Sequence, residues 1–307
     1  MNATTSNLQR VLESGAFAVT AECGPPRSAD RDVVIKKGLL LKKAVDAVNV
    51  TDNQTAIVRM SSIAAAAILK SIDLDPVFQM VCRDRNRIAM QSDVLGAAAL
   101  GIRNMLCLSG DHQKFGNQPQ AKNVFDLDSM QLLRTVTDMT EQGKFINDDY
   151  VMDTPPRIFA GAAENPFADP FEYRALRLAK KIENGAKFIQ TQCVFNLEKF
   201  AKWMQAVRKL GLHKKVYILA GVTPLKSAGM ARYMREKVAG MDVPDALIER
   251  MAKLKGPEAR EEGIRICVET IQKLRKMEGI AGVHIMAIEW EEAVPEIVAK
   301  AGLLPRP

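Results

Sequence analysis

The stretch Val-Thr-Ala-Glu-Cys-Gly-Pro-Pro, residues 19–26, decides the fold class. An apolar run that begins at Phe17 ends in a carboxylate, Glu22, and Gly24 and two prolines then stop the strand. The interior of a strand buried on both faces has no favourable place for a charge. A strand end that opens into a loop does, and barrel enzymes carry their catalytic groups at such ends. The stretch therefore predicts a buried first strand with a functional acid at its carboxyl end.

The rest of the chain repeats this unit, a short apolar run followed by a helical pattern. Eight strands are expected, at 17–23, 46–51, 76–82, 103–108, 157–161, 187–194, 215–220 and 282–287. Helices are expected at 32–44, 56–71, 86–100, 128–142, 170–184, 197–210, 227–239, 244–254, 258–278 and 291–301. Strands that alternate with helices predict parallel βα units.

An open doubly wound sheet is the competing architecture. A dinucleotide-binding sheet would place GxGxxG after its first strand, whereas this chain has Glu-Cys-Gly-Pro-Pro there. We therefore predict an α/β fold, a closed (β/α)8 TIM barrel that occupies residues 1–307 as a single domain. The polar stretch 110–123 follows the fourth strand and is expected on the catalytic face of the barrel.

Composition excludes several classes of protein. The 307 residues are 47% hydrophobic and 26% charged, which is ordinary for a chain with a large core. The net charge of +7 comes from Lys and Arg scattered among acids, without the basic and aromatic runs typical of nucleic-acid binding. The five cysteines form no CxxC pair and the histidines show no metal spacing, so no metal is expected. No signal peptide or membrane-spanning run is visible, and a cytoplasmic location is expected.

Three polar residues near the predicted strand ends have both structural and functional interpretations. Glu22 would either pair with Arg27 in the loop or, partly buried without a nearby cation, hold a proton near neutral pH as a general acid. Asp111 would either form a turn or stabilise a developing cation. Gln192 would either bond the backbone or bind a heterocycle through its paired donor and acceptor. The segment 161–166, Gly-Ala-Ala-Glu-Asn-Pro, is expected to be a loop of small residues that a flat ligand can approach.

Taken in order, these residues resemble the methylenetetrahydrofolate reductase family, flavin-dependent (β/α)8 barrels that reduce the methylene group on folate to a methyl group. The resemblance covers nearly the whole chain. The matching positions are Glu22 with Pro25 and Pro26, Val50-Thr51, Gly110-Asp111, Lys181 with Gly185-Ala186, Thr191-Gln192, and Gly221 with Pro224.

The resemblance implies a role for each matching site residue. Glu22 is implied to be the general acid that opens the five-membered ring of methylenetetrahydrofolate, and Asp111 to bind the pterin and favour the cationic intermediate. Gln192 is implied to contact the folate. Thr51, Asp111, Asn165 and Lys181 are implied to hold the flavin, FAD or alternatively FMN, with Lys181 near a phosphate.

The chain departs from the family pattern where ligand-stacking aromatic residues are usual. Ala228 stands where the family commonly has Phe, Met286 where it has Tyr, and Gly161-Ala162 where it has Tyr-Pro. Ser109, Asn165 and Arg174 replace an Arg, a His and an acid of the family. We therefore expect a divergent member, an oligomer, that receives electrons from a partner subunit rather than directly from NADH or NADPH.

Two other functions remain open at this point. The chain would instead be a flavin-free barrel that transfers a methyl group from methyltetrahydrofolate to a corrinoid protein, or a non-catalytic subunit that binds folate. A binding subunit has no need of the Glu22 acid, which favours an enzyme.

Overall fold

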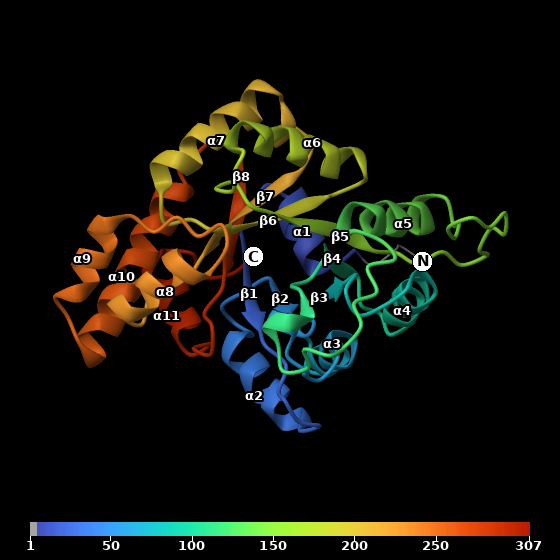
Figure 1. Cartoon of the computed structure of the whole chain (residues 1–307), viewed down its shortest axis with the longest axis horizontal. Coiled ribbons are helices and arrows are strands. Elements are labelled where there is room, and N and C mark those ends of the chain that lie inside the picture. Colours follow the sequence, from blue (N-terminus) through green and yellow to red (C-terminus); the bar gives the residue numbers. More distant parts are fainter. Residues whose placement is uncertain (1–4) are drawn as a thin grey trace.

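The computed structural model describes residues 5–307 and forms a closed barrel of eight parallel strands ordered β1 to β8 (Figure 1). The strands are β1 Ala18–Cys23, β2 Ala47–Val50, β3 Pro76–Val81, β4 Asn104–Leu108, β5 Phe159–Glu164, β6 Phe188–Cys193, β7 Tyr217–Val222 and β8 Ile280–Ile285. β8 pairs with β1 and closes the ring, with Thr20 opposite His284. The predicted TIM barrel is confirmed.

Helices surround the barrel on its outer side, apart from the first, which lies across one end (Figure 1). They are α1 Asn7–Glu13, α2 Arg31–Leu41, α3 Ser62–Lys70, α4 Arg87–Ala99, α5 Ser129–Glu141, α6 Arg174–Glu183, α7 Leu197–Lys209, α8 Ala228–Lys237, α9 Asp245–Ala252, α10 Gly256–Leu274 and α11 Ala293–Lys300. Three of them, α8 to α10, lie together between β7 and β8 along the chain. No helix within residues 5–307 is long and apolar enough to cross a membrane.

Helix α1 closes the amino-terminal end of the barrel, which we call the foot. Ser6 caps this helix by accepting the backbone N–H of Gln9. Leu8, Val11 and Leu12 are buried against apolar side chains from seven strands: Ala18, Ala47, Val77, Leu106, Phe159, Phe188 and Leu219. This helix was not among the expected elements, although its apolar residues follow helical spacing.

Strand β5 differs from its predicted range of 157–161. It continues to Glu164, so Gly161–Glu164 are a strand and not the expected loop of small residues. Pairing explains the extension, since Gly161 lies opposite Phe188 of β6. A Cβ atom at Gly161 would meet the Phe188 ring at 2.4 Å, so the glycine makes room for that ring. Small residues with little strand propensity are here held in a strand by their neighbours.

The helix predicted at 56–71 begins only at Ser62. Asn53, Thr55 and Ala56 have positive φ angles, which an α-helix does not allow. Residues before Ser62 instead form part of the wall around the carboxyl ends of the strands, which we call the mouth. The polar stretch after β4 packs on this segment, because a Cβ at Gly116 would lie 1.7 Å from the carbonyl oxygen of Ala56.

Candidate active site at the barrel mouth

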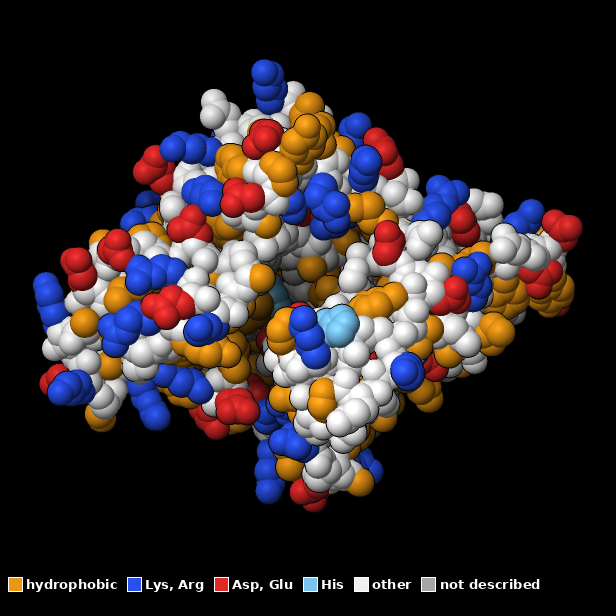
Figure 2. All heavy atoms as spheres, viewed as in Figure 1, with side chains coloured by type: hydrophobic (Ala, Val, Ile, Leu, Met, Phe, Trp, Pro, Cys, Tyr) orange, Lys and Arg blue, Asp and Glu red, His pale blue; other side chains and the backbone are white. Residues whose placement is uncertain are grey.

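A cavity of about 490 Å³ lies at the mouth, and Figure 2 shows a hollow near the centre of this face. Every strand but β2 and β7 contributes a lining side chain. Five of the six residues predicted for the site line the cavity: Glu22, Asp111, Asn165, Lys181 and Gln192. The strand ends therefore bring together residues that lie up to 170 positions apart in the sequence.

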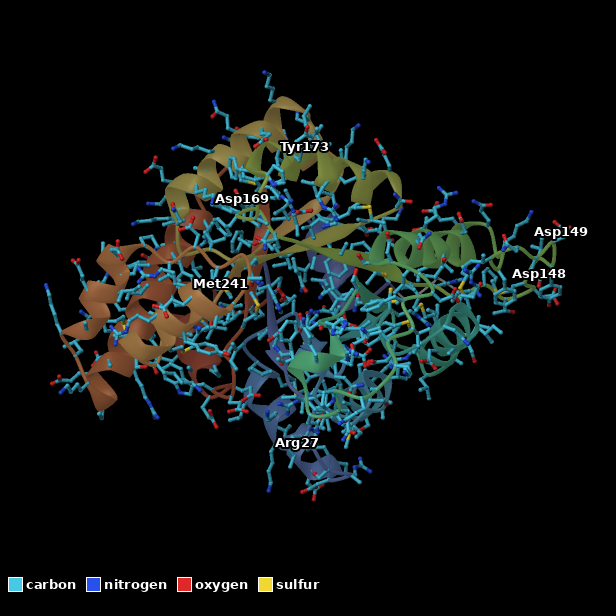
Figure 3. All side chains as sticks on the ribbon, in the orientation of Figure 1. Arg27, Asp148, Asp149, Asp169, Tyr173 and Met241 are labelled. Carbon is cyan, nitrogen blue, oxygen red and sulfur yellow. The ribbon has the colours of Figure 1, made fainter. Side chains whose placement is uncertain are left out.

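Glu22 lies one residue before the end of β1, and its side chain is 15% exposed. The loop that follows is held by Arg59, which donates to the carbonyl oxygen of Pro25 at 3.1 Å. Arg27 lies beside α2, away from the hollow (Figure 3), and no Glu22–Arg27 ion pair occurs within residues 5–307. His284 lies close to this carboxyl group, with its Nε2 3.8 Å from Oε1 of Glu22. The carboxyl group is thus free to face a ligand.

Cys23 is the neighbour of Glu22 and is fully buried. Burial raises the pKa of its thiol to about 12, although the positive charge of Lys37 acts in the other direction. Cys23 therefore remains protonated near neutral pH and offers no thiolate nucleophile.

Asp111 is exposed at the cavity after β4. Gly110 before it has φ of +88°, and a Cβ there would lie 2.9 Å from Cβ of Val81, so the turn requires glycine. The backbone oxygen of Asp111 accepts a 2.9 Å hydrogen bond from Arg83. The backbone is therefore fixed while the carboxylate stays available to a ligand.

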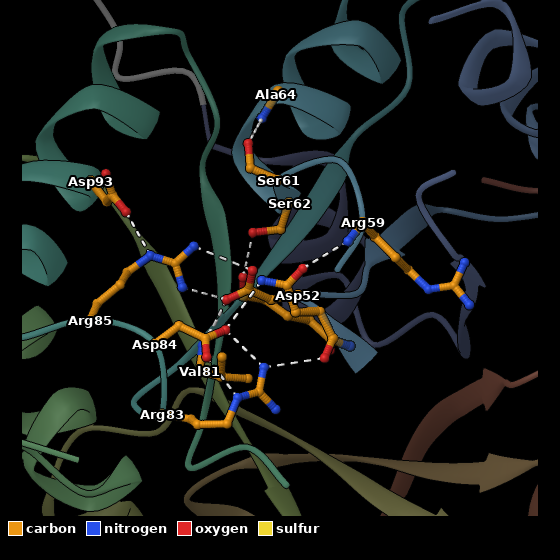
Figure 4. Close-up of polar contacts among 12 residues, drawn as sticks. Asp52, Arg59, Ser61, Ser62, Ala64, Val81, Arg83, Asp84, Arg85 and Asp93 are labelled. Carbon is orange, nitrogen blue, oxygen red and sulfur yellow. Dashed lines mark hydrogen bonds and ion pairs between the residues drawn. The ribbon is translucent and has the colours of Figure 1, made fainter. Parts of the chain in front are cut away.

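Arg83 and Arg85 follow β3 and form the support beneath this side of the mouth (Figure 4). Arg83 is 3% exposed, makes two hydrogen bonds of 2.6 and 2.7 Å to Asp84, and also donates to the carbonyl oxygen of Asn53 at 3.2 Å. Arg85 donates to the buried Asp52 at 2.7 Å and to Asp93 at 2.8 Å. These bonds join the loops after β2, β3 and β4 into one unit.

Lys181 of α6 reaches into the mouth and pairs with Glu164, the last residue of β5. The ammonium donates to Oε2 of Glu164 at 2.6 Å and to the carbonyl oxygen of Ala163 at 2.6 Å. The side chains of Lys181 and Glu164 are only 10% and 1% exposed. Burial lowers the pKa of Lys181, and the Glu164 carboxylate opposes that shift. The predicted flavin contact thus already carries a counter-ion.

The three remaining predicted site residues, Gln192, Asn165 and Thr51, differ in how many hydrogen bonds their side chains already make. Gln192 accepts the backbone N–H of Cys193 at 3.1 Å, which leaves its amide donor to the cavity. Asn165 accepts the N–H of Phe167 and lies against Gly240, where a Cβ would be 1.6 Å from its amide nitrogen. Thr51 is 1% exposed and does not line the cavity, and its Oγ1 has no hydrogen-bond partner among residues 5–307.

The remaining lining combines apolar surface with balanced charge. Val81, Leu106 and Leu108 face the cavity from neighbouring strands, and Arg174 and Arg177 face it from α6. Four basic and four acidic side chains line it: Arg83, Arg174, Arg177 and Lys181 against Glu22, Asp52, Asp111 and Glu164. Within residues 5–307, no Phe, Tyr or Trp lines it and no cluster of His, Cys, Asp or Glu has the arrangement of a metal site. The cavity therefore suits a polar heterocycle held by hydrogen bonds.

Sequence reasoning missed two buried titratable residues of this site. Glu164 was placed in a loop, although a carboxylate that ends a strand is the signal that identified Glu22. His284 is a single polar residue in the apolar run Val-His-Ile-Met, which gave no sign that it faces the barrel interior.

Fold and site together define a (β/α)8 barrel with an acid, an aspartate and an amide around one cavity at the mouth. Residues 7–302 match the model of the family described as methylenetetrahydrofolate reductase. The chain belongs to the methylenetetrahydrofolate reductase family.

Curated relatives carry the family name. Methylenetetrahydrofolate reductase 1 of Schizosaccharomyces pombe is 25% identical over 242 residues, which cover 77% of this chain and 37% of that protein. Probable methylenetetrahydrofolate reductase (NADPH) of Caenorhabditis elegans is 23% identical over 253 residues, 80% of this chain and 35% of that protein. The chain thus spans little more than a third of the length of these relatives.

A solved structure shares the fold at a TM-score of 0.67 and 14% sequence identity, over 95% of this chain and 97% of the other. It is an uncharacterized protein from Clostridium thermocellum that binds two copies of 5-methyl-5,6,7,8-tetrahydrofolic acid.

Proposed function

We propose that this chain is a flavin-dependent oxidoreductase that reduces 5,10-methylenetetrahydrofolate to 5-methyltetrahydrofolate. The observation that carries the proposal is the convergence of Glu22, Asp111 and Gln192 on one cavity in a chain of this family. The names of the relatives and the ligand of the structural neighbour support a folate substrate.

Glu22 acts as the general acid. Its proton passes to the ring nitrogen that leaves when the five-membered ring of the substrate opens, and the bond between that nitrogen and the methylene carbon breaks. The remaining nitrogen then carries an iminium group, whose positive charge the Asp111 carboxylate stabilises. Gln192 uses its free amide donor to orient the heterocycle.

The residues of the mouth fit a flavin, FAD or FMN. Val81, Leu106 and Leu108 offer apolar surface to a flat ring, whereas the hydroxyl of Thr51, which has no partner among the described residues, lies behind the cavity lining. Arg174, Arg177 and Lys181 would hold the phosphate, and Asn165 and Asp111, which line the same cavity, would bind the rest of the flavin. When bound, the reduced flavin supplies the hydride that the methylene carbon takes up.

The electron donor in this proposal is a partner subunit. The absence of aromatic side chains from the described cavity lining removes the surface on which a nicotinamide ring would stack. An NADH and NADPH oxidation assay on the isolated chain tests this part, and rapid turnover with either would contradict it.

The first experiment is an anaerobic absorbance spectrum of the chain supplied with FAD or FMN, before and after addition of 5-methyltetrahydrofolate. Bleaching of the oxidised-flavin band is expected, because the reverse reaction reduces the flavin. A flavin band that does not respond would contradict the substrate. A colourless protein that still binds 5-methyltetrahydrofolate would favour the methyl-transferring barrel instead.

A further inference from the structure

His284 is a buried titratable group that the proposed chemistry leaves without a role. It lies on β8 directly opposite Thr20 of β1, is 3% exposed, and lines the cavity beneath Glu22. An imidazole in this position has two nitrogens with different surroundings, so its tautomer decides what it presents to the acid.

The tautomer is set by two amides inside the barrel, Asn49 and Gln190. Asn49 of β2 and Gln190 of β6 bond each other reciprocally, with N–O distances of 2.6 and 2.9 Å, and both are fully buried. This pairing leaves one N–H of Gln190, which donates to Oγ1 of Thr20 at 3.2 Å. Thr20 therefore receives a hydrogen bond from the Gln190 side.

Thr20 must then give its own hydrogen elsewhere. Two acceptors are within reach, Nδ1 of His284 at 2.9 Å and the carbonyl oxygen of Val283 at 3.5 Å. The shorter contact is the stronger hydrogen bond. Nδ1 of His284 thus accepts, and the proton of the neutral ring resides on Nε2, the nitrogen that is 3.8 Å from Oε1 of Glu22.

We propose that His284 is the positioning residue for the Glu22 acid, and that the chain Asn49–Gln190–Thr20 fixes its neutral Nε2–H tautomer. An N–H aimed at Oε1 makes that oxygen the carbonyl acceptor of the protonated carboxyl group, so the acidic proton resides on the other oxygen. The distance of 3.8 Å shortens to a hydrogen bond in the substrate complex, as is common for catalytic contacts. This role rests on the proposed function, whereas the tautomer does not.

Nitrogen-15 NMR of histidine-labelled protein tests the tautomer at neutral pH, without substrate or cofactor. The chain has only three histidines, so the His284→Gln variant assigns the ring signals. A neutral ring protonated on Nε2 is expected, with its Nε2 signal shifted by Glu22→Gln. A proton on Nδ1 would overturn the inference, and is the result expected if the amide groups of Asn49 and Gln190 are both flipped by 180°. A doubly protonated ring would overturn it as well.

Kinetics of flavin reduction by 5-methyltetrahydrofolate test the positioning role. His284→Leu is expected to lower kcat about 100-fold, with KM within about threefold, because the acid loses its orientation. His284→Gln keeps an N–H donor and is expected to recover at least about tenfold of that loss. His213→Gln is the matched control with unchanged kcat, since His213 lies outside the cavity.

Equal losses in the Leu and Gln variants, or an unchanged kcat in His284→Leu, would overturn the positioning role. If the parent chain shows no reductase activity at all, the proposed function fails. The NMR result then still decides the tautomer, so the two failures are distinguishable.

Discussion

At the foot of the barrel the strands turn apolar side chains inward, whereas one layer higher the same strands present Thr20, Asn49, Gln190 and His284. The foot is closed by α1 and by the stacked rings of Phe159 and Phe188, whose centroids are 5.4 Å apart. The polar layer is equally buried, and it is stable because its members bond one another. The barrel thus separates a region that carries stability from a region that holds polar groups for chemistry.

The sharpest test of this separation is Glu22→Gln at the mouth. Removal of the general acid is expected to lower the rate of flavin reduction by 5-methyltetrahydrofolate about 10²–10⁴-fold. The free energy of unfolding is expected to change by no more than about 0.5 kcal/mol, because within residues 5–307 Glu22 makes no ion pair shorter than the 3.8 Å contact to His284. Stopped-flow absorbance and urea unfolding measure the two quantities. A rate above a tenth of the parent would contradict the acid role.

The opposite result is expected for Phe188→Ala at the foot. This ring is fully buried against Phe159 and Gly161, so its loss leaves a cavity and should cost about 3–5 kcal/mol of unfolding free energy. Urea unfolding measures the loss, and Phe188→Leu, which fills part of the space, should lose less. A cost below about 1 kcal/mol would show that the foot does not carry the stability assigned to it.

The buried ion pair of Lys181 and Glu164 lies at the mouth, but its disruption should lower the free energy of unfolding, as a substitution at the foot does. Lys181→Met leaves the Glu164 carboxylate buried without its counter-ion and is expected to cost about 3 kcal/mol. The double variant with Glu164→Gln should recover much of that loss, since an amide needs no counter-ion. Urea unfolding of the single and double variants measures the coupling. If the two losses simply add, the pair does not act as a unit.

The smallest effect is expected at the outer edge of the mouth, where Arg87 of α4 bonds Asp126. Hydrogen bonds from the Arg87 guanidinium and backbone N–H lower the pKa of Asp126 from 3.8 to about 2. As the pH falls, Asp126 is therefore protonated in the unfolded chain before it is protonated in the folded one. Its contribution to the free energy of unfolding is present above about pH 4 and is lost as the pH falls through 2. Urea unfolding between pH 2 and 5 should show a weaker loss in Asp126→Asn. A pH dependence equal to that of the parent would contradict the assignment.

The sequence predicted the barrel because each of the eight strands is a local apolar run, and every predicted range overlaps the observed strand. The end of β5 could not be predicted from the sequence, since Gly161 and its neighbours become a strand only through pairing with β4 and β6. Helix α1 was missed because seven residues give a weak periodic signal, and its stability comes from the barrel beneath it.

The site was predicted where a polar residue interrupts an apolar run at a strand end. Glu22 and Gln192 are of this kind, and Asp111 follows the turn after β4; all three line the cavity, and their roles stay predictions. His284 and Glu164 depend instead on partners at a distance, Thr20 across the closing seam of the barrel and Lys181 on the next helix. Such pairs are set by strand register and helix placement, which single-residue patterns do not contain.

Arg83 holds the loops after β2 and β4 through the carbonyl oxygens of Asn53 and Asp111, not through their side chains. A carbonyl oxygen is the same acceptor whichever residue carries it. A substitution at Asp111 therefore changes what the mouth offers to a ligand without breaking this bond, whereas the Asn53 side chain also holds its own loop, donating to Asp84 at 3.2 Å and accepting the N–H of Arg59 at 3.0 Å. Descendants of this barrel have room to acquire a new substrate preference by single substitutions, provided that they keep the arginine.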